Sequence, residues 1–311
     1  MPPRAAVTVG GLFHDAVRRL EGALLHYGQG THNARDDAAY LILHTLQLPL
    51  DDLTPYRQRI LTPSEQRRIL ALVKRRIREQ IPVAYLTREA WLGEYSFYVD
   101  RRVIIPRSFI AELAREQFVP WLRRPVHSVL DLCTGSGCLA VVLAKTFPKA
   151  TVDATDISPG ALAVARRNVA RYRLARRIRL VRSDLFSEMK GRRYDLIVSN
   201  PPYVNAASMR SLPREYHHEP SLALAGGDDG LALVRRILTS AAEYLQPGGL
   251  LLCEIGHNRR VLERAYPSVP FAWPETSVGP GHVFVLEREA LVALDAGTIQ
   301  SGSTGRKRGK G

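Results

Sequence analysis

Apolar residues repeat at helical spacing from about residue 8 to residue 80. One stripe runs from Leu12 to Leu25, and a second runs from Ala38 to Leu46. Thr62-Pro63-Ser64-Glu65 opens a third helix, because proline suits the first turn of a helix. Its apolar face holds Ile69, Leu70, Val73 and Ile77, and its other faces carry Arg67, Arg68, Lys74, Arg75, Arg76 and Arg78. We therefore expect a helical domain over residues 1–86 with a basic outer face, which is either solvated or a contact surface.

Aromatic and β-branched residues dominate positions 89–105, with breaks at Gly93 and Asp100-Arg101. This composition predicts a β-hairpin, which we place in a linker over residues 87–108. The hairpin is expected to end at Pro106-Arg107-Ser108, before a helix from about 109 to 122.

Strands and helices then alternate along the chain. Strands are expected at 127–132, 151–156, 178–183, 194–199, 249–255 and 282–287, and helices near 138–147, 159–171, 231–245 and 258–265. Such alternation predicts a parallel sheet with helices on both faces. The fold class is therefore α/β, with a Rossmann-like sheet domain over residues 109–292. Residues 293–311 contain Gly, Ser and Thr before a basic end, which predicts a disordered basic tail.

Four successive predicted strands end in residues that can bind a ligand. The first runs into Asp131-Leu132-Cys133-Thr134-Gly135-Ser136-Gly137-Cys138, where two glycines let the backbone approach a ligand closely. Position 140 is Ala where the Gly-x-Gly-x-x-Gly fingerprint has its last Gly, a change that the fingerprint tolerates. The loop alone fits either NAD or S-adenosylmethionine. Asp156 ends the next strand, where an acid can bind ribose hydroxyls.

The third and fourth strand ends add further polar groups. Asp184 can meet an adenine amine, with Phe186 beside the ring. The fourth strand leads into Asn200-Pro201-Pro202-Tyr203. Asn200 offers an acceptor and a donor, Pro201 has a free carbonyl and no N–H, and Tyr203 has a flat face for stacking. Each residue alone is as well explained by a turn or a cap. Four in succession, at the sheet edge where ligands bind, predict a nucleotide-cofactor site.

The length, net charge and cysteine count of the chain limit the class of protein to which it can belong. The chain has 311 residues and a formal net charge of +14, which either suits contact with polyanions or reflects the Arg-rich composition of proteins from a high-GC genome. Cys133, Cys138 and Cys253 are too few for a disulfide framework, so we expect reduced thiols. His217-His218-Glu219 lacks further Cys or His partners, and we expect no metal site. No apolar run approaches a membrane span and the start lacks a secretion signal, so we expect a cytoplasmic protein.

The strand-end residues together resemble class I S-adenosylmethionine methyltransferases that methylate amino groups. The helical start, the segment 81–86 and the hairpin resemble the protein-(glutamine-N(5)) methyltransferases. Within that family, Val103-Ile104-Ile105-Pro106-Arg107-Ser108 looks like the branch that modifies the L-three protein of the large ribosomal subunit. The release-factor branch typically has Pro-Arg-Pro followed by an acid there. The resemblance covers about residues 10–290, and Cys133 departs from a Gly common in the wider family.

The resemblance implies methyl transfer from S-adenosylmethionine to a glutamine side-chain amide. Asn200 and Pro201 would accept the two amide hydrogens, and Tyr203 would stack on the amide plane. Cofactor contacts are expected from Asp131, Cys133, Thr134, Gly135, Ser136, Gly137, Asp156, Asp184, Phe186 and Asn200. Substrate contacts are expected from Arg107, Pro202 and Tyr203, although Arg107 is as well explained as a solvated linker residue.

Three alternatives stay open. A release factor is a second substrate for the same reaction. An adenine methyltransferase acting on DNA or RNA shares Asn-Pro-Pro-Tyr, but no target-recognition domain follows residue 290. A nonenzymatic RNA-binding assembly factor would not need an intact cofactor loop. The expected partner is the L-three protein, met free or in an assembling ribosome with RNA nearby.

Overall fold

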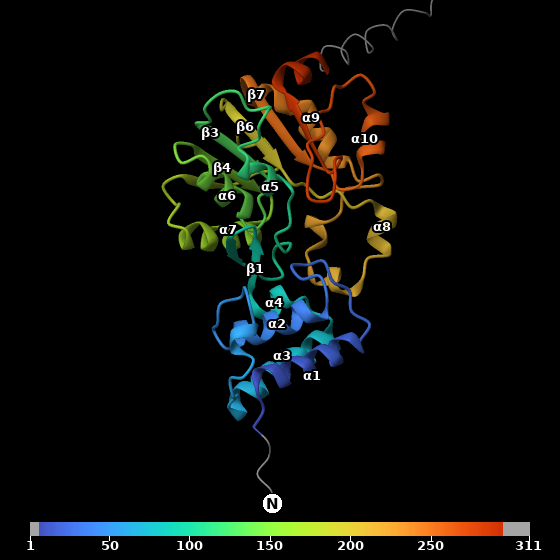
Figure 1. Cartoon of the computed structure of the whole chain (residues 1–311). Helices are drawn as coiled ribbons and strands as arrows, with labels where there is room; N and C mark the ends of the chain where they lie inside the picture. Colours follow the sequence, from blue (N-terminus) through green and yellow to red (C-terminus); the bar gives the residue numbers. More distant parts are fainter. Residues whose placement is uncertain (1–5, 295–311) are drawn as a thin grey trace, which may run out of the picture.

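A computed structural model describes residues 6–294, and the predicted basic tail lies outside the described residues except for its first two positions. Helices gather at one end of the molecule and a sheet domain at the other (Figure 1). The first end contains α1 (Val9–Glu21), α2 (Ala34–Thr45), η1 (Thr54–Tyr56), α3 (Pro63–Glu79) and α4 (Val83–Thr87). The side chain of Thr62 caps α3 by accepting the backbone N–H of Glu65, whose carboxylate accepts the N–H of Thr62 in return. The predicted start of the third helix is thereby confirmed.

The hairpin is shorter than predicted. It consists of β1 (Glu89–Leu92) and β2 (Tyr95–Tyr98), and Val103–Ile105 belong to no strand, so the predicted extent to residue 105 is wrong. Side chains satisfy the backbone there instead of a neighbouring strand: the hydroxyl of Tyr85 donates to the carbonyl of Val103, and the N–H of Ile105 donates to Glu219.

Six strands form one sheet in the order β5-β4-β3-β6-β7-β8. They are β3 (Ser128–Leu132), β4 (Thr151–Asp156), β5 (Ile178–Arg182), β6 (Tyr194–Ser199), β7 (Leu245–Glu254) and β8 (Val283–Glu287). The Rossmann-like α/β prediction is confirmed, with one difference. β8 is antiparallel to β7, because the chain re-enters the sheet beside the end of β7, where Ile255 donates to the carbonyl of His282 at 2.8 Å.

Helices cover both faces of the sheet (Figure 1). α5 (Ile110–Arg115), α6 (Cys138–Thr146) and α7 (Pro159–Arg171) pack on one face, and α9 (Ala232–Tyr244) and α10 (Arg259–Ala265) pack on the other. The helix predicted over 109–122 ends at Arg115. Gln117 and Phe118 adopt positive φ angles, and the ring of Phe118 is buried in the core beside Phe147.

Residues 204–226 leave the sheet domain after β6 and reach the helical domain (Figure 1). We call this stretch the bridging segment. It contains α8 (Ala206–Arg210), η2 (Arg214–His218) and η3 (Ser221–Ala223), none of which was predicted. Its two ends pair with each other: the N–H of Val204 donates to the carbonyl of Leu224, and the N–H of Gly226 donates to the carbonyl of Val204.

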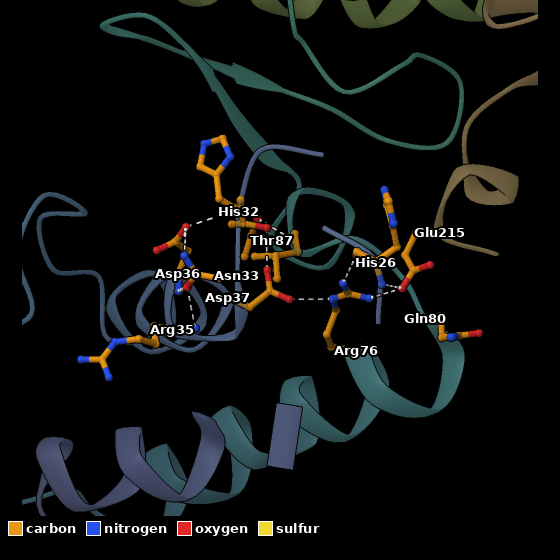
Figure 2. Close-up of polar contacts among 12 residues, drawn as sticks. His26, His32, Asn33, Arg35, Asp36, Asp37, Arg76, Gln80, Thr87 and Glu215 are labelled. Carbon is orange, nitrogen blue, oxygen red and sulfur yellow. Dashed lines mark hydrogen bonds and ion pairs between the residues drawn. The ribbon is translucent and has the colours of Figure 1, made fainter. Parts of the chain in front are cut away.

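We predicted from the sequence that Arg76 belongs to the basic outer face of α3, and this prediction is wrong. Its side chain is 2% exposed and donates to Asp37 of α2, to Glu215 of the bridging segment and to the carbonyl of His26 (Figure 2). The other predicted basic residues of α3 are exposed. Arg76 follows Ile69 and Val73 by seven and three positions, so it falls on the buried stripe of the helix.

Candidate active site

A cavity of about 300 Å³ lies where β3, β4, β5 and β6 end. These strands are parallel neighbours, so the loops that follow them meet at one edge of the sheet. The predicted site residues that line the cavity are Arg107, Cys133, Thr134, Gly135, Ser136, Asp156, Asp184, Asn200 and Pro202. Asp131, Gly137, Phe186, Pro201 and Tyr203 are not among the lining residues.

The loop after β3 is shaped by positive φ angles at Cys133, Gly135 and Gly137. A side chain at Gly135 would meet nothing within 4 Å, so the bare backbone faces open space. A side chain at Gly137 would lie 3.1 Å from the Cβ of Ala165, so glycine there allows α6 to pack closely on α7. One glycine thus opens the loop to a ligand, and the other fixes the helix behind it.

Two carboxylates hold the loop in shape. Asp156 accepts the backbone N–H of Gly135 and that of Ser158, both at 2.9 Å, and burial raises its pKa. Asp131 is fully buried and accepts the hydroxyl of Thr134 at 2.5 Å. Burial raises the pKa of Asp131 to about 7, although the hydrogen bond from Thr134 favours the charged form and so acts to lower the pKa. Asp156 therefore lines the cavity, whereas Asp131 holds the loop through Thr134 without lining the cavity.

The loop after β5 contributes differently from the prediction. The carboxylate of Asp184 lines the cavity and pairs with Arg236 at 2.9 Å. Phe186 is buried and stacks on Tyr244, with ring centroids 4.6 Å apart, and Leu185 lines the cavity in its place. Ile157, Leu233 and Arg236 also line the cavity. The last two lie on α9, so no pattern near the strand ends could have predicted them.

Asn200 is oriented by the linker. Its side-chain nitrogen donates to the carbonyl oxygen of Arg107 at 3.0 Å. Within residues 6–294, no hydrogen bond reaches the Oδ1 of Asn200 or the carbonyl oxygen of Pro201. Two acceptors at the end of β6 thus have no partner within the described residues, and of the two residues only Asn200 lines the cavity.

Tyr203 is held behind Asn200. Its ring lies against the bare backbone of Gly256, where a side chain would come within 2.6 Å of the ring. Burial, and then the carboxylate of Glu254, raises the pKa of Tyr203, so its hydroxyl stays protonated and faces Glu254 at 3.4 Å.

Arg107 is not a free linker residue. Its guanidinium donates to both oxygens of Glu219, at 2.6 and 2.7 Å, and lies over the ring of Tyr216, 5.5 Å from its centroid. Its carbonyl oxygen accepts from Asn200, as described above. A direct contact between Arg107 and a substrate stays a prediction.

Glu254 is a site residue that sequence reasoning missed. It ends β7, is 2% exposed and accepts the hydroxyl of Ser108 at 2.7 Å and the N–H of Phe109 at 3.0 Å. These contacts hold the linker whose carbonyl orients Asn200. An acid directly after the apolar strand Leu250–Cys253 was a usable signal, because β7 ends at the same edge of the sheet as β6.

Burial raises the pKa of Glu254 from 4.5 to about 7. Between these values the folded protein keeps a proton that the unfolded chain has lost, so this group's contribution to stability is present below pH 4.5 and is lost as pH rises to about 7. We expect the free energy of unfolding of wild type, minus that of Glu254→Gln, to fall across this window. Urea unfolding of both proteins measures the difference, in which the similar contribution of Asp131 cancels. A difference that stays constant with pH would contradict the raised pKa.

Cys133, Cys138 and Cys253 are free thiols, as predicted. His218 contacts the carbonyl of Glu79, and Glu219 is paired with Arg107. Within residues 6–294, no three His, Cys, Asp or Glu side chains gather as a metal site would need. None of the helices over that range has the length and apolar character to cross a membrane.

Two family models match the chain. Residues 12–87 match the PrmC N-terminal domain, and residues 113–213 match the methyltransferase small domain. Among solved structures, the hMettl16 catalytic domain aligns with 76% of this chain and 84% of its own, at 18% identity and a TM-score of 0.48, a likeness too distant to add to these matches.

Closer relatives cover nearly the whole chain. A protein from Neisseria meningitidis serogroup B is 56% identical over 287 residues, covering 92% of this chain and 94% of the relative. Relatives from Bordetella pertussis and Burkholderia pseudomallei are 51% and 48% identical, covering 91% and 94% of this chain and 96% and 98% of their own. All three bear the name ribosomal protein uL3 glutamine methyltransferase.

Proposed function

Because the chain belongs to the family of the ribosomal protein uL3 glutamine methyltransferases, we propose that it transfers a methyl group from S-adenosylmethionine to a glutamine side-chain nitrogen of uL3. The protein is a methyltransferase by family, and the identity of its substrate is the proposal. The observation that supports amide chemistry is at Asn200, which lines the cavity and donates through its nitrogen to the carbonyl of Arg107, so that its Oδ1 has no partner within the described residues.

The residues of the cavity fit S-adenosylmethionine. The backbone at Gly135 is open to a ligand, and the carboxylates of Asp156 and Asp184 suit ribose hydroxyls and an adenine amine. Leu185 and Ile157 offer apolar surface for the adenine ring. When bound, this cofactor supplies a methyl group on a positively charged sulfur.

The chain's own residues would position the acceptor. An amide nitrogen is a poor nucleophile, because its lone pair is delocalised into the carbonyl. The Oδ1 of Asn200 and the carbonyl of Pro201 would accept the two amide hydrogens and fix the direction of the nitrogen. The same acceptors stabilise positive charge as it develops on that nitrogen. No strong base is needed, because the amide proton becomes acidic only as the nitrogen gains its methyl group.

Pro202 and Tyr203 complete the proposed substrate site. Pro202 lines the cavity beside Asn200, and the half-buried Tyr203 contacts Gly256 and Glu254 without lining the cavity. For Tyr203 to stack on the amide plane, the substrate would have to reach its ring, which does not line the cavity. We therefore propose that Tyr203 mainly supports the turn.

We propose that residues 1–86 recognise the protein substrate, residues 87–108 link the two parts and residues 109–292 carry the reaction. The net charge of +14 would favour contact with RNA around an assembling substrate and would repel free basic uL3. We place the reaction in the cytoplasm, where ribosomal proteins are made.

Incubation of the purified protein with S-adenosylmethionine and, in parallel, uL3, a release factor and a DNA duplex tests the substrate. Intact-mass measurement should find one added methyl group on uL3 alone. A methyl group on the release factor instead would keep the chemistry and contradict the substrate. Methylated DNA would contradict both.

A further inference from the structure

The bridging segment carries two carboxylates on one short turn that face different parts of the molecule. Glu215 lies in η2 and is 1% exposed, and Glu219 follows η2 and is 5% exposed. Glu215 contacts the helical domain, whereas Glu219 contacts the linker beside the cavity. Because only four positions separate them, a shift of one carries the other with it.

The contact of Glu215 with the helical domain is built from several bonds (Figure 2). Its Oε1 accepts from Arg76 at 3.1 Å and from the backbone N–H of His26 at 2.8 Å. Arg76 is itself fixed by Asp37 at 2.7 Å, and the hydroxyl of Thr31 donates to the other oxygen of Asp37. These charged side chains are buried, and a buried charge is destabilising unless its partners stay in place, so the contact tolerates little displacement.

The contact of Glu219 leads to the reacting centre. Glu219 binds the guanidinium of Arg107 and the N–H of Ile105. The carbonyl of Arg107 orients Asn200. Immediately beyond Glu219, Pro220, Leu222 and Ala223 line the cavity.

The remainder of the segment is anchored on the same side. Arg214 reaches Gln80 and His218 reaches the carbonyl of Glu79, both at the end of α3. Within residues 6–294, each hydrogen bond that a side chain of the bridging segment makes with a residue beyond the segment goes to the helical domain or to the linker. The sheet domain holds the bridging segment chiefly through backbone hydrogen bonds near the two ends of the segment. One of them joins the N–H of Ala206 to the carbonyl of Gly227.

We propose that the helical domain positions the active site through the bridging segment, with Arg76 and Glu215 as the positioning pair. The domain thereby does more than bind a substrate: it holds one wall of the cavity and the linker that orients Asn200. The docking itself is independent of the substrate, and only the kinetic consequence rests on the proposed function.

Hydrogen–deuterium exchange of the full-length protein tests the docking. Glu215→Ala is expected to speed amide exchange across residues 214–223 at least tenfold and to leave the strands of the sheet unchanged. Thr45→Val is the matched control, because Thr45 lies in α2 of the same helical domain and its buried hydroxyl donates to the carbonyl of Leu41, outside the bonds that link Asp37, Arg76 and Glu215. It should lower the melting temperature and leave exchange in the bridging segment at the wild-type rate. Unchanged exchange in Glu215→Ala, or an equal rise in Thr45→Val, would overturn the proposal.

Kinetics separates positioning from loss of fold. In Glu215→Ala the kcat for methyl transfer should fall at least tenfold, while the Kd for S-adenosylmethionine changes less than twofold. Glu215→Gln keeps an oxygen for the N–H of His26 and should recover part of the loss, and Thr45→Val should keep the wild-type kcat. An equal kcat loss in Glu215→Ala and Thr45→Val would overturn the positioning role. If the wild-type protein left uL3 unmethylated, the proposed substrate would be contradicted. The hydrogen–deuterium exchange experiment would still show whether Glu215 docks the bridging segment on the helical domain.

Discussion

Asn200→Ala is expected to lower kcat for methyl transfer by about 10³-fold, the scale at which loss of one preorganised polar group acts on a transition state. The reason is geometric. Alanine removes the Oδ1 that would accept an amide hydrogen and also the nitrogen that ties this position to Arg107. The Kd for S-adenosylmethionine should change by less than about threefold, because the loop after β3 and Asp156 stay intact. Initial-rate kinetics and isothermal titration measure the two quantities separately.

Asn205→Ala is the matched control for this experiment. Asn205 lies five residues further along and caps α8 by accepting the N–H of Ser208, without lining the cavity. Its replacement should leave kcat unchanged. Near-wild-type turnover in Asn200→Ala would remove Asn200 from the mechanism.

Asp156→Ala is expected to weaken S-adenosylmethionine binding about 10- to 100-fold, since a hydrogen bond to a charged group contributes about 1.5–3 kcal/mol. The carboxylate lines the cavity and also holds the N–H of Gly135, so its loss removes a ligand contact and loosens the loop. Titration of the cofactor into both proteins gives the ratio of Kd values directly.

Asp153→Ala provides the comparison on the same strand. Asp153 pairs with Arg179 and Arg192 and accepts the hydroxyl of Tyr194, away from the cavity. This change should cost stability and leave the Kd for S-adenosylmethionine near its wild-type value. Equal affinities of Asp156→Ala and wild type would count against a ribose contact.

Local patterns in the sequence determined most of the fold. β4, β6 and α7 begin and end where predicted. The apolar run Leu196-Ile197-Val198 marks β6, and the helix-opening Ser158-Pro159 marks α7, without help from distant residues. Val103–Ile105 look like a strand by composition. Their backbone groups are instead taken by Tyr85 and Glu219, and pairing over such separations cannot be deduced from local composition.

The site was predictable where its residues follow strands directly. The loop after β3, Asp156, Asp184 and Asn200 all reach one cavity, because parallel strands end at a common edge. Phe186 lies elsewhere, since Leu185 has a φ of 51° and the ring that follows packs on Tyr244. Contacts supplied from other elements, such as Arg236 to Asp184, required the three-dimensional structure.

The partners of Arg107 and Arg76 show the same limit. Glu219 lies 112 positions from Arg107, and Glu215 lies 139 positions from Arg76. No spacing rule connects residues so far apart in one sequence. The position of Arg76 on the apolar stripe of α3 was nevertheless a signal that its charge is buried, and hence that a partner exists.

Asn200 is proposed to present a glutamine amide to the cofactor cavity. Tandem mass spectrometry of uL3, after reaction with S-adenosylmethionine carrying a deuterated methyl group, tests this role. We expect one labelled methyl group on the side-chain nitrogen of a single glutamine, and no label with Asn200→Ala in the time that wild type needs to complete the reaction. A label on lysine, arginine or the terminal amine of uL3, or a glutamine label that persists in Asn200→Ala, would contradict it.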